Sequence, residues 1–101
     1  LSYTMLSGKQ KRFLRAKAHH LKAVFQVGKS GVTDNMIEQL KDVLEKRELI
    51  KINILQNCLE DKHVVADQIA IGTDAEIVQI IGNHIILYKE SEDNKNIVLP
   101  E

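Results

Sequence analysis

Residues 23–56, AVFQVGKSGVTDNMIEQLKDVLEKRELIKINILQ, carry the pattern most informative about the fold. The segment Ala23–Val27 is short, β-branched and aromatic and ends at a glycine, which is typical of a buried strand. Thr33 is a good N-cap, and apolar side chains recur after it at helical spacing. They are Met36, Ile37, Leu40, Val43 and Leu44. Glu48–Gln56 then alternates isoleucines with polar residues, so the stretch predicts strand, tight loop, helix and half-buried strand.

The sequence before this stretch predicts an amphipathic first helix from about Gly8 to Leu21. Ser7 and Gln10 have the spacing of a capping box, in which each side chain accepts the other residue's backbone N–H. One side of the helix is apolar and holds Phe13, Leu14, Ala18 and Leu21. Because Lys17 falls within that side, we expect its stem to lie along the edge of the core with the ammonium in water.

The sequence after Gln56 predicts a third helix, a hairpin and a tail. Asp61–Ile71 has a weaker helical pattern, closed by Gly72 at the C′ position. Its expected buried residues are Val64, Val65 and Ile69. The β-rich runs Ala75–Ile81 and His84–Lys89 flank Gly82–Asn83, a pair typical of a tight turn, and therefore predict an antiparallel hairpin. The polar stretch from Glu90 to the C-terminus is expected to be frayed or weakly docked.

The predicted order is αβαβαββ. Helical connections between the early strands favour a mixed sheet, so we expect an α/β two-layer sandwich with a four-stranded mixed sheet. A length of 101 residues with 44% hydrophobic and 28% charged residues suits one globular domain. We place this domain at residues 5–90, followed by a polar acidic tail over residues 91–101. Residues 1–4 are expected to be a leader or cloning remnant if Met5 is the natural start; the alternative is that the chain is trimmed before Leu1.

Bases and acids are separated along the chain although the net charge is zero. Residues 1–33 hold seven bases and no acid, whereas residues 60–101 hold three bases and nine acids. Such a gradient suggests that the basic region meets a polyanion; the alternative is that the two ends pair with each other. The lone Cys58 cannot form an internal disulfide, and no apolar run approaches the roughly 20 residues of a membrane-spanning helix. We therefore expect a reducing, cytoplasmic setting and no membrane partner.

The loop Gly28-Lys29-Ser30-Gly31 is the strongest candidate site. Two glycines let a sugar-phosphate backbone approach closely, while the loop N–H groups and Lys29 offer donors to phosphate. A GxxG loop of this type clamps nucleic-acid backbone in KH domains, although a plain tight turn could use the same two glycines. The preceding basic helix favours binding. The expected phosphate contacts there are Lys9, Lys11, Arg12, Arg15 and Lys22, with His19 on the rim.

Other chemistry finds no support in the sequence. Gly28-Lys29-Ser30 resembles the end of a P-loop, but that motif needs a glycine where this chain has Ala23. The adjacent pair His19-His20 cannot chelate one ion unaided, and the histidines show no metal-ligand spacing. Cys58 lacks a basic neighbourhood and Ser30 lacks a general base. We therefore predict no catalytic residue, no metal and no cofactor.

The chain has only four aromatic residues, which limits base stacking. Phe25 is expected in the core, and Tyr88 could serve either the core or RNA contact. His20 is expected at the boundary of the first helix. Few exposed aromatics disfavour sequence-specific reading of single strands, which leaves recognition of backbone and shape in structured RNA.

Six short motifs, in this order, resemble those of a known family. They are LSGKQKRFLR (6–15), AHHL (18–21), QVGKSG (26–31), ELIK (48–51), VQIIGN (78–83) and LYK (87–89). The chain from Met5 to about Lys89 thereby resembles the bacterial YhbY/YqeI family, whose members are stand-alone versions of the CRM domain, named for chloroplast RNA splicing and ribosome maturation.

This resemblance implies a fold similar to the C-terminal domain of translation initiation factor three. It also implies an RNA-binding protein that associates with rRNA in precursor large ribosomal subunits as an assembly factor. The family's GxxG loop corresponds to Gly28–Gly31, and its basic patch corresponds to the first helix. Many members carry arginine where this chain has Asn83, so an RNA contact by that arginine is not carried over.

A second class of function is a protein-interaction module, in which the basic helix meets an acidic partner. In that case the loop glycines would be replaceable. A small hydrolase or nucleotide-binding enzyme is the residual alternative, and activity screens with and without divalent metal would reveal it.

Overall fold

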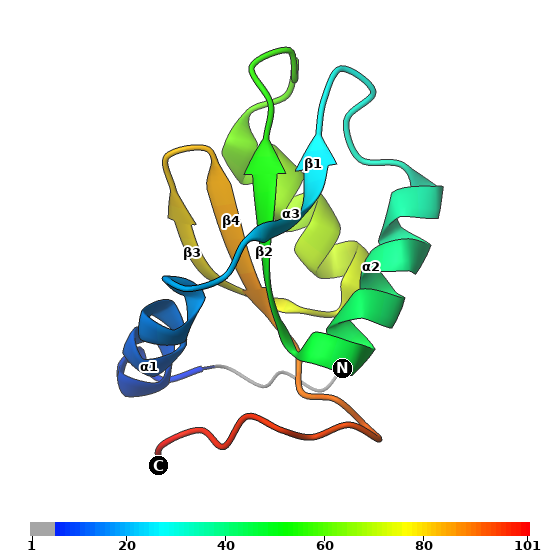
Figure 1. Ribbon diagram of the computed structural model, residues 1–101. Helices are drawn as coiled ribbons and strands as arrows, with labels where there is room; N and C mark the ends of the chain where they lie inside the picture. Colours follow the sequence, from blue (N-terminus) through cyan, green and yellow to red (C-terminus); the bar gives the residue numbers. More distant parts are fainter. Residues whose placement is uncertain (1–5) are drawn as a thin grey trace.

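Seven helices and strands follow one another in the predicted order αβαβαββ (Figure 1). The computed structural model describes residues 6–101, so the expected remnant 1–4 and the start at Met5 lie outside the described residues. The elements are α1 (Gly8–Ala18), β1 (Ala23–Val27), α2 (Asp34–Arg47), β2 (Leu49–Ile54), α3 (Lys62–Thr73), β3 (Glu76–Ile81) and β4 (His84–Tyr88). None of the helices in the described part of the chain is long and apolar enough to span a bilayer.

The four strands form one mixed sheet in the order β1-β2-β4-β3, as the predicted fold class requires. β1 runs parallel to β2, whereas β4 is antiparallel to both β2 and β3. Because β1 lies at the edge, only Val27 of its five residues is buried. The expectation of a buried first strand is therefore wrong, since edge position depends on pairing that the local sequence does not encode.

Helices α2 and α3 cover one face of the sheet and form with it the two packed layers predicted from the sequence, while α1 lies on the other face. The alternation of β2 places Ile50, Ile52 and Ile54 on this face. Leu40 and Leu44 of α2 are fully buried against them. Burying a Leu or Ile side chain stabilises a fold by about 1.5–3 kcal/mol, so this cluster holds the domain together.

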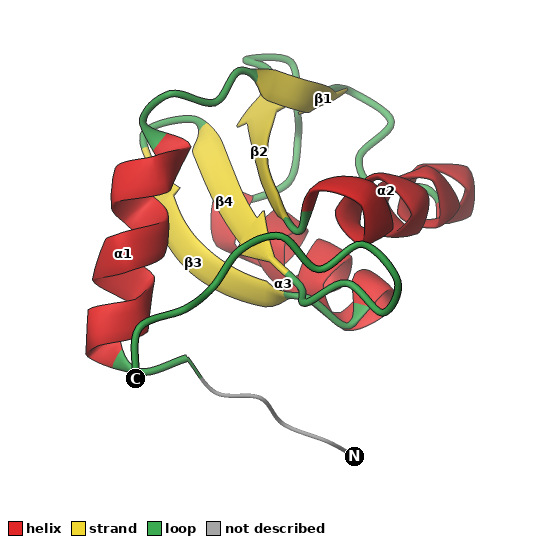
Figure 2. Ribbon diagram, turned by 60° about the horizontal axis from the view of Figure 1, so that its bottom comes forward, coloured by secondary structure: helices red, strands yellow, loops and turns green. Residues whose placement is uncertain are grey.

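Helix α1 and the C-terminal segment cover part of the opposite face (Figure 2). Leu14 and Ala18 of α1 are buried there against Val78, Ile86 and Tyr88 of the hairpin. A capping box fixes the start of α1, with the Gln10 N–H donating to Ser7 Oγ and the Ser7 N–H to Gln10 Oε1. The helix ends at Ala18 rather than at the predicted Leu21, because His19 and His20 form a turn.

The end of α3 also differs from the prediction. Gly72 lies inside the helix, and Asp74, with φ of 60°, takes the left-handed position predicted for that glycine. Gly72 instead faces α2, where an added Cβ would lie 2.8 Å from Ile37 Cδ1. On the same helix Val64 is 43% exposed, contrary to expectation, and Ala66 is buried in its place.

The C-terminal segment is docked by several hydrogen bonds and apolar contacts, which corrects the expectation of a frayed or weakly docked tail. Ser91 is buried, and Ile97 and Leu99 pack against the cluster that holds α1. Two carboxylates of α2 and its C-cap, Glu45 and Glu48, accept N–H groups from residues 91–97 at 2.8–3.0 Å. These charge-assisted hydrogen bonds hold the segment on the domain although its sequence is polar and offers few apolar side chains for packing.

Candidate nucleic-acid interface

The loop that follows β1 is a tight turn, as predicted from its two glycines. The Gly31 N–H donates to the Gly28 carbonyl at 3.0 Å, and Lys29 and Ser30 are exposed at the tip. Gly31 has φ of 66°, a left-handed conformation that side-chain-bearing residues rarely adopt. The loop therefore presents one lysine and a hydroxyl on a narrow backbone turn that a phosphate can approach.

A second loop lies beside this turn. Because β1 and β2 are parallel, their carboxyl ends meet at one edge of the sheet, and the Leu55 N–H donates to the Val27 carbonyl at 2.9 Å. A Cβ added to Gly28 would lie 3.2 Å from Asn57 Oδ1. Sequence reasoning missed Asn57 as a neighbour of the site. The signal was present in the strand–helix–strand pattern, which implies parallel pairing of β1 and β2.

The turn of the β3–β4 hairpin reaches the same end of the sheet (Figure 1). The Ile54 N–H donates to the Asn83 carbonyl at 2.7 Å, and Lys62 Nζ donates to the Gly82 carbonyl at 2.9 Å. Asn83 itself is exposed. Three turns, after β1, β2 and β3, thus form one end of the molecule, and Lys62 was not among the predicted site residues.

The bases of α1 lie on the solvent side of that helix. Burial of Leu14 and Ala18 in the sheet turns Lys9, Arg12 and His19 outward, where all three are exposed. Lys11 and Arg15 flank them and are half-buried. Within residues 6–101 the ion pairs are Lys41–Glu38 and Lys95–Glu90, so no base of α1 is neutralised by an acid there.

The structure does not bring the basic helix and the GxxG loop into contact. Figure 1 places α1 and the β1–α2 loop at opposite corners of the molecule, and Figure 2 separates them as well. Lys22 lies between them, directly before β1, and is exposed. At roughly 3.3 Å per residue, the six steps from Lys22 to Gly28 span about 20 Å. A ligand that contacts both regions must therefore be an extended polyanion.

Other residues considered in the sequence have structural roles or stand alone. Tyr88 is buried; burial, with the nearby carboxylates of Glu48, Glu90 and Glu76, raises the pKa of its phenol to about 12. Phe25 packs at the margin of the main core. His20 is exposed rather than at a boundary. Lys17 Nζ lies 5.4 Å from the centre of the Phe13 ring, in line with the expected snorkelling position.

No group of three potential metal ligands occurs within residues 6–101. Cys58 is half-buried, with its sulfur 3.8 Å from the Glu60 carbonyl. The candidate site described above contains backbone turns and cations, which suit the binding of an anionic chain.

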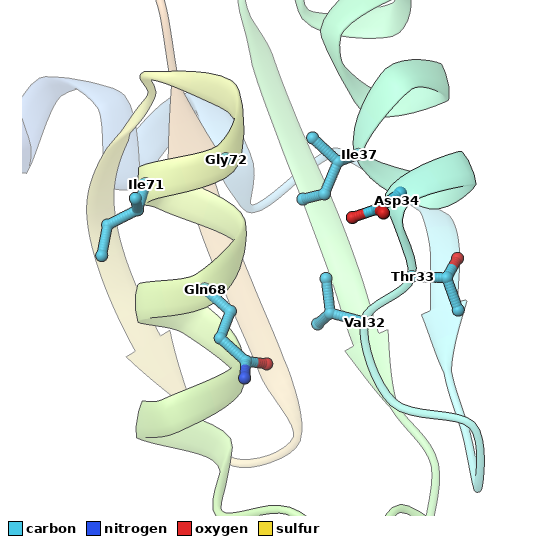
Figure 3. A pocket seen from close by; sticks show the side chains of 7 residues that line it. All are labelled: Val32, Thr33, Asp34, Ile37, Gln68, Ile71 and Gly72. Carbon is cyan, nitrogen blue, oxygen red and sulfur yellow. The ribbon is translucent and has the colours of Figure 1, made fainter.

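A cavity of about 390 Å³ adjoins the GxxG loop, between the start of α2 and the second half of α3 (Figure 3). Its walls include Val32 and Ile37, and Gly72 allows the two helices to approach closely. The carboxylate of Asp34 and the amide of Gln68 extend toward the cavity from opposite sides (Figure 3). Val32 directly follows Gly31, so the cavity opens beside the turn.

These features define a small α/β domain with a basic helix and a glycine turn. The model of the CRS1/YhbY (CRM) domain matches residues 6–89. The chain therefore belongs to the CRS1/YhbY (CRM) domain family, as its six motifs predicted.

Relatives of known sequence agree with this assignment. The chain is 62% identical over 96 residues to the "Probable RNA-binding protein YqeI" of Bacillus subtilis, which covers 95% of this chain and 100% of that protein. It is 39% identical to an "RNA-binding protein" of Haemophilus influenzae, over 96% of this chain and 97% of the relative.

A solved structure also shares this fold. The solution structure of the hypothetical protein SAV1595 from Staphylococcus aureus superimposes with a TM-score of 0.79 and 51% identity. The match covers 95% of this chain and all of the other.

Proposed function

We propose that this protein binds RNA, and that its target is structured rRNA in precursor large ribosomal subunits, where it acts as an assembly factor in the cytoplasm. The observation that carries the proposal is the set of α1 bases that no acid neutralises within residues 6–101. The relatives named as RNA-binding proteins, from two bacteria, support it.

The proposed mechanism has two parts. The bases of α1 and Lys22 attract the RNA and neutralise phosphates, which releases counterions. The turn Gly28–Gly31 then approaches the backbone closely, with Lys29 and loop N–H groups as donors. Neither part needs a catalytic residue, a metal or a cofactor.

The separation of helix and loop favours a long ligand. A free phosphate compound can contact one of the two regions, whereas a folded RNA can follow the edge strand β1 from Lys22 to Gly28. The rival function, a protein-interaction module that uses α1 alone, predicts no role for Lys29.

The test is fluorescence-anisotropy binding of a structured large-subunit rRNA fragment at several salt concentrations, with tRNA as a second structured RNA. The variants are Lys9→Glu/Arg12→Glu on α1 and Lys29→Glu in the loop, because all three side chains are exposed. Two exposed bases in the last turn of α2 supply matched controls for the change in charge: Lys46→Glu/Arg47→Glu for the double variant and Lys46→Glu for Lys29→Glu.

We expect log Kd to depend linearly on log salt, with a slope near 0.7–0.9 per neutralised phosphate. Each lost phosphate contact should lower that slope by about one. The α1 and loop variants should both weaken binding while the controls bind as the unchanged chain does. Binding that is insensitive to Lys29→Glu would favour the protein-partner alternative, and equal affinity for tRNA would refute the rRNA target.

A further inference from the structure

We propose that the cavity between α2 and α3 binds an unpaired guanine base of the RNA whose backbone contacts the Gly28–Gly31 turn. This inference rests on the proposed function and names part of its substrate. The cavity has a volume of about 390 Å³ and is lined in part by the aliphatic side chains of Val32 and Ile37. An open, apolar cleft with a few polar groups suits a flat, uncharged aromatic ring.

The position of the cavity points to a nucleotide already held by the loop. Val32, which lines the cavity, directly follows Gly31, so an RNA backbone bound at the turn would lie beside the opening of the cavity. Recognition of RNA outside helices commonly takes unstacked bases into such sites while the backbone is held separately. The cavity and the turn would thus bind two parts of one nucleotide chain.

The negative charge of Asp34 at the cavity favours binding of an uncharged base over binding of a phosphate. Asp34 occupies the first turn of α2, is exposed, and makes no ion pair within residues 6–101. Its carboxylate would repel a phosphate at this helix end. A carboxylate accepts hydrogen bonds only, so it favours a base edge that presents donors.

Guanine is the base that best matches such an acceptor. Its Watson–Crick edge carries two adjacent donors, N1–H and the N2 amino group, which can bind both oxygens of one carboxylate. Adenine and cytosine each present a single amino group, and uracil presents one N–H. Gln68, on the facing side of the cavity, has both a donor and an acceptor for the remaining polar atoms of the ring.

The first test compares eight-nucleotide single strands that differ at one central position, guanine or inosine, against a background of uracil. Inosine lacks only the N2 amino group, so it removes one of the two donors. We expect the guanine strand to bind about tenfold more tightly, the scale of one hydrogen bond to a charged group. In Asp34→Asn the preference should fall, because the amide keeps one acceptor oxygen and replaces the other with a donor, so it no longer accepts from both N1–H and the N2 amino group.

Asp42→Asn is the matched control, since Asp42 is exposed on the same helix and does not line the cavity. Both variants remove one negative charge, and this loss of charge should change the affinity for all strands alike; only Asp34→Asn should also change the guanine-to-inosine ratio. The guanine-to-inosine ratio therefore separates base recognition from general electrostatics. Equal binding of the two strands by the unchanged chain would overturn the guanine pocket and leave RNA binding intact.

A second measurement does not depend on RNA binding. Titration with guanosine monophosphate, followed by methyl NMR, should shift the Val32 and Ile37 signals and leave those of Leu14 in α1 unchanged. Adenosine monophosphate should shift them at least several-fold less at the same concentration. If rRNA fails to bind but these shifts occur, the pocket stands and the RNA function falls; absent or base-independent shifts would overturn the pocket.

Discussion

Gly31 and Gly28 constrain the turn in different ways. A Cβ at Gly31 would meet no atom within 4 Å, but φ of 66° makes any L side chain strained there. A Cβ at Gly28 would instead crowd Asn57. Substituting Gly31 therefore perturbs the fold as well as the binding surface, whereas at Gly28 the exposed Asn57 side chain must shift by a few tenths of an ångström; the exposed Lys29 gives a clearer report of RNA contact.

Asn83 is the residue at which we expect affinity to be gained. It is exposed on the hairpin turn, at the same end of the sheet as the GxxG loop. Asn83→Arg adds a guanidinium there, which should tighten rRNA binding by about threefold to tenfold and steepen the salt dependence, as one added phosphate contact does. Anisotropy titrations at two salt concentrations measure both effects.

The control for this gain is Gln39→Arg, which adds the same charge at an exposed position in α2. It should change affinity much less. An equal gain from both substitutions would mean that net charge alone matters and that the hairpin turn does not contact RNA.

The docking of the C-terminal segment depends on two carboxylates, both of which lie near the end of α2. Burial raises the pKa of Glu48, but the N–H groups of Ile97, Ser91 and Asn96 outweigh it and bring the pKa below its ordinary value. The N–H of Glu92, the hydroxyl of Ser91 and further donors lower the pKa of Glu45 to about 2.

Acid should therefore loosen this segment. A carboxyl whose pKa falls from 4.5 in the unfolded chain to about 2 stabilises the fold above pH 4.5, and this contribution is lost as the pH falls toward 2. In Glu45→Gln the midpoint of urea unfolding should be lower at pH 6 and should decline less between pH 5 and pH 2.5. The exposed Glu60→Gln should follow the unchanged chain; an identical pH profile for Glu45→Gln would contradict the role of these hydrogen bonds.

The elements that the sequence predicted well are those with strong local periodicity. The stripe of α2 and the alternation of β2 depend on neighbouring residues only, and both occur as expected. The misassigned features depend on distant partners. Gly72 leaves room for Ile37 of α2 to pack against α3. β1 is exposed because it lies at the edge of the sheet. The C-terminal segment is held by hydrogen bonds to Glu45, which lies 46–49 residues earlier in the chain.

In the candidate site, too, the features that depend on local sequence could be predicted and those that depend on distant contacts could not. The turn Gly28–Gly31 could be predicted because glycine spacing is local, and the exposure of Lys9 and Arg12 follows from the helical wheel. The separation of helix and loop could not be predicted. It results from α1 packing on the face of the sheet opposite α2, a choice that no pattern within either segment records.

For the whole molecule, the two clusters on opposite faces of the sheet should differ in their dependence on the C-terminal segment. Ile97 and Leu99 pack only against the cluster that contains α1. Ile97→Ala/Leu99→Ala should cost about 2 kcal/mol in the free energy of unfolding, given the apolar surface that these partly buried side chains cover. Amide exchange should accelerate in α1 and less in α2 and α3.

Val98 lies between these two residues and is 83% exposed, so Val98→Ala is the matched control and should leave exchange unchanged. Uniform acceleration over all three helices in the double variant would show that the two clusters unfold as one unit, contrary to this expectation.

The contacts of α1 also set an order of events during synthesis. Within this domain α1 leaves the ribosome before the other elements, but the Leu6 N–H donates to Glu76 and the Gln10 side chain donates to the carbonyl of Pro100, 90 residues further along the chain. At roughly 5–20 residues per second, the nascent helix waits for several seconds before its partners exist. Within this domain we therefore expect α1 to be made before its partners and to be secured after them, so that a basic amphipathic segment stays accessible to nearby polyanions until Pro100 has been synthesised.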